Sequence, residues 1–148
     1  MFRVCKSFVV ESGHMLALHP ERCRHPHGHT RHIDVVVAGE SLDERGMLLD
    51  FKALKRAVEP IVERYDHAMA INVADPLLPT LRELHAEAII PFDGEPTTEA
   101  MAKVLFDEIS DILRDGWTDG VYAIEAGRVR LERVRVGETP SSWAEYGF

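Results

Sequence analysis

The 148-residue sequence has only two cysteines, Cys5 and Cys23, which is too few for a fold held together by disulfides. It also has no apolar run near the roughly 18 residues of a membrane span, and its first residues lack the apolar segment of a signal peptide. Repeats, low-complexity tracts and flexible linkers are absent too. These absences predict one domain, residues 1–148, in the reducing cytoplasm, with both cysteines as free thiols and no membrane partner.

Basic residues are in deficit, because 17 Lys and Arg against 25 Asp and Glu give a formal net charge of −8. General nucleic-acid binders need a basic field to displace counterions from phosphates, so we expect no nucleic-acid partner. A small anionic substrate is still compatible with this charge, since it needs only a local basic pocket.

Hydrophobic periodicity predicts the element order β-β-α-α-β-β. Strands are expected at 2–12 and 33–37, helices at 51–65 and from 98 onward, and strands at 129–138 and 143–146. Asp50 and Thr97 stand at the two helix starts, and Asp50 is a plausible N-cap. In the 129–138 strand the apolar parity changes, which predicts either a bulge near Glu132 and Arg133 or a strand packed on both faces.

This order predicts an α+β fold in which two helices cover one face of a four-stranded antiparallel sheet. Open sheet edges favour assembly with further copies of the chain. The connection from Asn72 to Pro96 is long, and such loops often act as lids or contain small elements of their own. A short helix at 77–86 and an extended piece at 89–90 are expected there.

The densest chemical signal is the segment Cys23-Arg24-His25-Pro26-His27-Gly28-His29, with His14 thirteen positions before His27. In an extended strand, His27 and His29 project to the same face. If both strands are regular, His14 continues the same apolar face of the sheet. Three histidines with an open fourth position are typical of catalytic zinc, so we predict a metal site there.

Cys23 has two interpretations at this point. It could be a fourth ligand that closes a structural zinc site. It could instead be a thiolate near the metal that acts as a general base. Spacing alone does not separate these roles.

Two further positions carry possible chemistry. Asp66-His67 follows the first helix and is either a solvated helix-end pair or a proton relay in which the carboxylate orients the imidazole. Glu138, near a strand end, is either a solvated charge or the anchor of a ligand amide edge.

A basic group formed by Arg22, Arg24, Arg31 and His32 surrounds the histidine segment. It is either a solvated edge or a phosphate subsite, because the arginine fork matches phosphate oxygens.

These residues resemble the 6-pyruvoyltetrahydropterin synthase / 6-carboxytetrahydropterin synthase family along most of the chain. The resemblance rests on six motifs in the right order: Gly13-His14, Cys23 with His27-Gly28-His29, Gly46 to Phe51 leading into Leu54-Lys55, Asp66-His67 with Asn72, Pro96 to Glu99, and Glu138-Thr139. It implies the tunnelling fold (T-fold), in which trimers close their sheets into a barrel and usually stack as hexamers. The likeness also implies zinc on His14, His27 and His29, Cys23 as base, Asp66 and His67 as relay, and Glu138 as pterin anchor.

Three residues separate Cys23 from His27, a spacing that resembles the carboxy-type enzymes. The implied function is a zinc-dependent lyase that converts 7,8-dihydroneopterin triphosphate to 6-carboxy-5,6,7,8-tetrahydropterin on the route to queuosine, releasing triphosphate and acetaldehyde. The alternatives are a 6-pyruvoyltetrahydropterin synthase acting on the same substrate and a non-catalytic zinc-binding oligomer.

Overall fold

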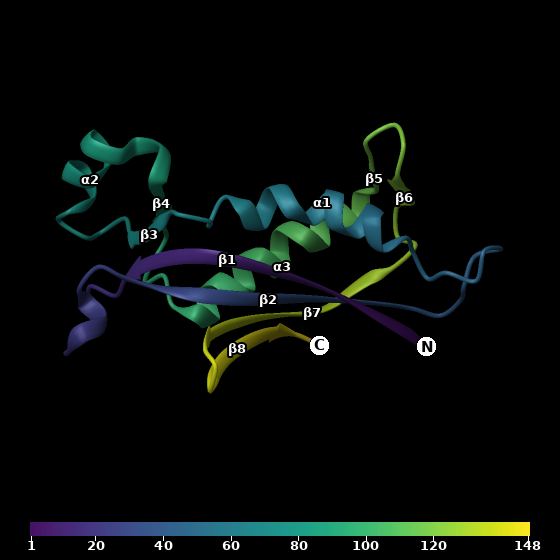
Figure 1. Ribbon diagram of the computed structural model, residues 1–148, viewed down its shortest axis with the longest axis horizontal. Coiled ribbons are helices and arrows are strands. Elements are labelled where there is room, and N and C mark those ends of the chain that lie inside the picture. Colours follow the sequence, from purple (N-terminus) through teal and green to yellow (C-terminus); the bar gives the residue numbers. More distant parts are fainter.

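The computed structural model describes residues 1–148 and places two helices along one side of a long, curled sheet (Figure 1). The elements are, in order, β1 (Phe2–Met15), η1 (Arg22–Arg24), β2 (His27–Gly39), α1 (Phe51–Glu63), β3 (Met69–Asn72), α2 (Leu78–His85), η2 (Ala86–Ala88), β4 (Ile89–Phe92), α3 (Thr98–Asp115), β5 (Trp117–Thr118), β6 (Ala123–Ile124), β7 (Arg130–Thr139) and β8 (Ser142–Gly147). No helix among them is both long and apolar enough to cross a membrane.

The predicted four antiparallel strands are present as β1, β2, β7 and β8, but the sheet contains six strands rather than four. The strands β3 and β4 extend it in parallel beside the last residues of β1, in the order β4-β3-β1-β2-β7-β8. Each added strand has four residues, too few for alternation to reveal β3 in the sequence, while the extended piece expected at 89–90 is part of β4. β5 and β6 form a separate two-stranded ribbon.

The long pair β1–β2 fixes the geometry of the site. It is antiparallel without a register shift from Phe2 opposite Gly39 to His14 opposite His27. The predicted alternation therefore continues unbroken along both strands, and His14, His27 and His29 lie on the face that carries Phe8 and Val10.

The predicted bulge in β7 is confirmed. Val36 of β2 pairs with Arg133 and Val37 pairs with Leu131, so Glu132 is the extra residue. Because of this extra residue, the inward-facing positions are odd-numbered before the bulge, as at Leu131, and even-numbered after it, as at Val134, which is the change that the sequence indicated.

A single large core lies between the sheet and the helices α1 and α3. Asp50 caps α1 by accepting a hydrogen bond from the Lys52 amide at 2.7 Å, and the Thr97 hydroxyl accepts from the Ala100 amide at 3.1 Å at the start of α3.

The predicted short helix at 77–86 is present as α2. It is a third helix, set beside β3 and β4 at the end of the sheet, where Leu78 packs with Met15 and Ile71 in a smaller core.

Candidate metal and ligand site

Three imidazoles converge where β1 ends and β2 begins. The ring centroid of His14 lies 4.5 Å from that of His27 and 5.1 Å from that of His29, and the His27 and His29 centroids are 5.1 Å apart. The Nε2 atoms of His14 and His29 are 3.2 Å apart. One ring nitrogen from each histidine lies within 4.8 Å of the others, so the three side chains could hold one metal ion.

Backbone carbonyls orient two of these rings. The Nδ1–H of His14 donates to the Pro96 carbonyl at 2.8 Å, and the Nδ1–H of His27 donates to the His25 carbonyl at 2.8 Å. A carbonyl oxygen can only accept, so in both rings the proton is on Nδ1 and the Nε2 lone pair is free. This is the arrangement in which metal-binding histidines are held by their outer hydrogen bonds.

The electrostatics of the cluster also suit a cation. Burial, with Arg31 and the other histidines, lowers the pKa of His14 to about 4, and burial and Arg31 lower the pKa of His29. These imidazoles are therefore neutral near pH 7, as metal ligands must be. A set of three histidines fits zinc with an open fourth position.

Two glycines allow the strands to approach at this point. Gly13 lies opposite Gly28 in the β1–β2 ladder. A Cβ on Gly28 would lie 3.1 Å from the Ser12 carbonyl oxygen, and one on Gly13 would lie 2.9 Å from the Met69 methyl. A side chain on Gly28 would therefore require the Ser12 backbone to shift by a few tenths of an ångström, whereas the flexible Met69 side chain could move away from one on Gly13.

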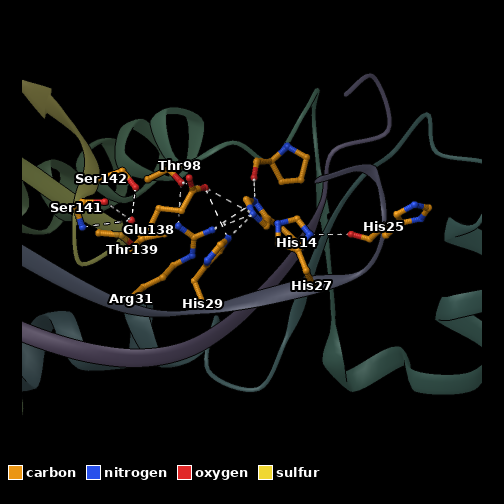
Figure 2. A network of polar contacts seen from close by, with 12 residues as sticks. His14, His25, His27, His29, Arg31, Thr98, Glu138, Thr139, Ser141 and Ser142 are labelled. Atoms are coloured by element: carbon orange, nitrogen blue, oxygen red, sulfur yellow. Dashed lines mark hydrogen bonds and ion pairs between the residues drawn. The ribbon is translucent and has the colours of Figure 1, made fainter. Parts of the chain in front are cut away.

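Glu138, near the end of β7, faces the histidines from the other side (Figure 2). Its Oε1 accepts a hydrogen bond from the Thr98 hydroxyl at 2.8 Å and lies 3.8 Å from the Nε2 atoms of both His14 and His29. Burial opposes ionisation of Glu138, but the Thr98 hydroxyl and the neighbouring cationic groups keep its pKa below the ordinary value. The residue is thus a carboxylate directed at the cluster.

Arg31 is part of this group and does not belong to a solvated basic edge. Its side chain is 1% exposed, and its guanidinium contacts Thr98 and His14 (Figure 2). The strand alternation could have revealed this, because position 31 shares the parity of His29 and Ile33. Arg22, Arg24 and His32 are exposed, so a phosphate subsite can use those residues but not the buried arginine.

The Asp66–His67 pair lies on the turn after α1 and is tied to β1. The Asp66 carboxylate accepts from the Glu11 amide at 2.8 Å and from His67 Nδ1 at 2.8 Å, while the His67 amide donates to the Glu11 carbonyl at 2.6 Å. His67 has a φ of 55°, in the left-handed region, and its side chain is 80% exposed. Such backbone strain in a non-glycine residue is often found at functional sites.

A cavity of about 550 Å³ extends from His67 to two of the clustered histidines. His27, His29 and His67 line one part of it, and Leu81 and His85 of the α2 segment line another. The long connection therefore contributes a wall to the site, as its length suggested.

Cys23 lies in η1, just before β2, as a half-buried free thiol. It is absent from the group of potential metal ligands and from the residues lining the cavity. The structure thus brings together His14, His27, His29 and Glu138, places His67, the partner of Asp66, in the cavity that His27 and His29 also line, and leaves Cys23 outside both groups.

Comparison with known proteins places the chain among pterin synthases. Residues 3–147 match the sequence model of the 6-pyruvoyl tetrahydropterin synthase family. The chain is 33% identical over 129 residues to the 6-carboxy-5,6,7,8-tetrahydropterin synthase of Aquifex aeolicus, covering 84% of this chain and 75% of that protein. It is 30% identical over 150 residues to the Synechocystis protein of the same name, covering 99% and 93%.

Solved structures share the fold. An uncharacterized protein from Wolinella succinogenes superposes with a TM-score of 0.79 at 22% identity, covering 99% of this chain and 97% of that chain. The 6-pyruvoyl tetrahydropterin synthase of Caenorhabditis elegans gives a TM-score of 0.69 at 19% identity, covering 99% and 95%. The predicted α+β tunnelling fold is confirmed by these likenesses.

Proposed function

The chain belongs to the 6-pyruvoyl tetrahydropterin synthase family, and on this premise we propose that it is a zinc-dependent lyase. Its substrate is 7,8-dihydroneopterin triphosphate, its product is 6-carboxy-5,6,7,8-tetrahydropterin, and triphosphate and acetaldehyde are released as one water is consumed. The observation that carries the proposal is the convergence of three histidines, with one ring nitrogen of each within 4.8 Å of the others, beside the Glu138 carboxylate. Relatives named 6-carboxy-5,6,7,8-tetrahydropterin synthase support the carboxy product.

The roles follow from chemistry and position. His14, His27 and His29 would hold the zinc ion, which when bound supplies Lewis acidity toward the hydroxyl groups of the substrate side chain. Glu138 would accept hydrogen bonds from the amino and ring N–H groups of the pterin, because a carboxylate has two acceptor oxygens for such an edge. The ring is then held with its side chain toward the histidines.

Two groups would move protons. Cys23, separated from His27 by three residues, would remove a proton from the substrate side chain as a thiolate. His67 faces the cavity, and Asp66 fixes its Nδ1–H, so its Nε2 is free to exchange a proton with the substrate. The Asp66 carboxylate raises the pKa of His67, which makes the imidazole a better base.

The decisive experiment loads the protein with zinc, adds dihydroneopterin triphosphate and identifies the products by mass. 6-Carboxytetrahydropterin with acetaldehyde supports the proposal, and 6-pyruvoyltetrahydropterin would support the alternative synthase. Stoichiometric zinc without turnover would contradict both and favour a non-catalytic zinc-binding protein.

We also propose that the chain works as a homo-oligomer in the cytoplasm, as a trimer or hexamer, within queuosine biosynthesis. The outer edge of β8 has no partner strand in the sheet, and Trp143, Tyr146 and Phe148 are exposed there. Sedimentation analysis of the zinc-loaded protein tests the assembly, and a monomer at micromolar concentration would contradict it.

A further inference from the structure

The buried guanidinium of Arg31 has more donors than acceptors. Its Nη1 donates to the Thr98 hydroxyl at 3.0 Å and to the Gly137 carbonyl at 3.4 Å, but its Nε has no partner. Its Nη2 contacts only the ring of His14, at 3.3 Å from Nδ1 and 3.5 Å from Nε2. Buried charges normally have all their hydrogen bonds satisfied, so this arrangement calls for an explanation.

The contact with His14 does not satisfy Nη2. The Nδ1 of His14 already carries the proton that it donates to Pro96, and its Nε2 is directed at His29. A ring that is held in this way and that ligates a metal has no free lone pair for Arg31. The favourable partner for the arginine charge is therefore the Glu138 carboxylate, which it reaches through Thr98.

Thr98 links the two charges. Its hydroxyl accepts from Arg31 and donates to Glu138 Oε1, so the three side chains form one chain of hydrogen bonds with both ends charged (Figure 2). Hydrogen bonds that involve charged groups are shorter and stronger than neutral ones, and such chains polarise each other.

The same Glu138 oxygen also lies close to the histidines that would bind the metal ion. It lies 3.8 Å from the Nε2 atoms of His14 and His29, the atoms directed at the metal position. A carboxylate is a common zinc ligand, and a fourth protein ligand would close the site. The contacts that hold Glu138 therefore decide whether the fourth coordination position of the metal is free or occupied by a protein ligand.

We propose that Arg31 and Thr98 act as a clamp that withholds Glu138 from the metal and keeps the fourth coordination position open for the organic ligand. The inference rests on the metal site and on the Glu138 anchor of the proposed function. Arg31 and Thr98 are positioning residues in this arrangement, since they act through Glu138. A merely structural role for Arg31 would affect folding without changing metal coordination.

The experiment uses the full chain loaded with Co²⁺, whose absorption spectrum reports coordination, and thiocyanate as a probe of the open position. Thr98→Val removes the linking hydroxyl at nearly constant volume and leaves the arginine in place. Arg31→Met removes the other end of the clamp. Each change is also made together with Glu138→Gln, which removes the anionic oxygen that would move onto the metal.

In Thr98→Val we expect Co²⁺ affinity to rise and thiocyanate affinity to fall, each by about tenfold, the scale on which outer hydrogen bonds tune metal sites. Arg31→Met should change both in the same direction. The Glu138→Gln background should abolish the changes made by Thr98→Val, because no carboxylate is left to bind.

Wild-type spectra and affinities in both Thr98→Val and Arg31→Met would overturn the clamp, as would changes of equal size in the Glu138→Gln background. The background comparison also corrects for the general effect of removing the arginine charge near a cation. Turnover is measured separately on the wild type, so a working clamp without turnover would contradict the lyase assignment alone.

Discussion

Two imidazoles in this site are held through Nδ1, yet they sit in opposite environments. His14 is 1% exposed, and its burial lowers its pKa to about 4 even though its hydrogen bond to the Pro96 carbonyl acts in the opposite direction. His67 has an 80% exposed side chain and pairs with the Asp66 carboxylate, which raises its pKa. Burial favours the neutral ring that a metal needs, while an exposed carboxylate pair favours a ring that can carry a proton.

The difference assigns separate tasks to the two regions. The buried cluster of His14, His27 and His29 should control metal affinity and leave proton transfer to other groups. The exposed pair of Asp66 and His67 should control turnover and leave metal affinity unchanged. A variant of the buried cluster that keeps full metal affinity, or a variant of the exposed pair that changes metal affinity, would contradict this division.

The largest effect is expected when a ligand of the buried cluster is removed. His27→Ala should abolish stoichiometric zinc binding and turnover, because two histidines cannot hold zinc in a three-ligand site. His27 is half-buried, so the folding cost is smaller than for His14. Zinc content after dialysis is the measurement, and His32→Ala, an exposed histidine on the same strand, is the matched control. Full retention of zinc in His27→Ala would contradict the site.

Replacing Cys23 tests whether its thiol is a metal ligand or a group that moves protons. Cys23→Ala should reduce turnover to background and leave one zinc per chain, since the thiol is absent from the group of potential ligands. Metal analysis and product mass measure the two quantities, and Cys5→Ala, the exposed second thiol, is the control. Loss of zinc in Cys23→Ala would make the cysteine a fourth ligand.

The exposed pair is tested by Asp66→Asn, which keeps the side-chain oxygen that faces the Glu11 amide but removes the charge. Turnover should fall by about 10²–10⁴-fold, the range for loss of general acid–base catalysis, with unchanged zinc content. A control is Asp119→Asn, another exposed carboxylate with backbone and arginine partners far from the site. Unchanged turnover in Asp66→Asn would remove the relay from the mechanism.

Much of this arrangement could be predicted from local rules. The parity of β1 and β2 placed three histidines on one face, and the parity change in β7 located the bulge at Glu132. The same rule applied to position 31 would have placed Arg31 inside, but a charged side chain on the core face contradicts the usual pattern of burial. At this site the burial of Arg31 thus follows from its position in the strand alternation and not from its residue type.

Other features depend on contacts that the sequence does not express. The Pro96 carbonyl that orients His14 is 82 positions away, and Thr98 meets Glu138 across 40 positions. The strand β3 was not predicted, and β4 was predicted only as an extended piece at 89–90, because pairing of β3 with Gly13 to Met15 and of β4 with β3, and not propensity, defines these strands. Local sequence patterns therefore identify the residues of the site, whereas long-range contacts determine how their side chains are oriented.

The smallest expected effect concerns stability and follows from the pKa values of the exposed pair. The pKa of His67 is raised above 6.5, so its contribution is complete below about pH 6.5 and is lost as the pH rises through the raised value. The Glu11 amide and His67 lower the pKa of Asp66 below 3.8, so its contribution is present above that pH and is lost as the pH falls through the lowered value. The pair therefore stabilises the fold most between about pH 4 and 6.5.

The unfolding temperatures of wild type and Asp66→Asn, compared from pH 4 to pH 9, should differ most in that window, and the difference should narrow above it to the part that the Glu11 amide supplies. The difference should be small, because solvent screens an exposed pair and salt weakens it further. NMR titration should give a His67 pKa above 6.5 in the wild type and a lower one in the variant. A constant gap across the whole pH range would mean that Asp66 stabilises the turn through the Glu11 amide and not through charge, and His67 would then lack the raised basicity that distinguishes it from His14.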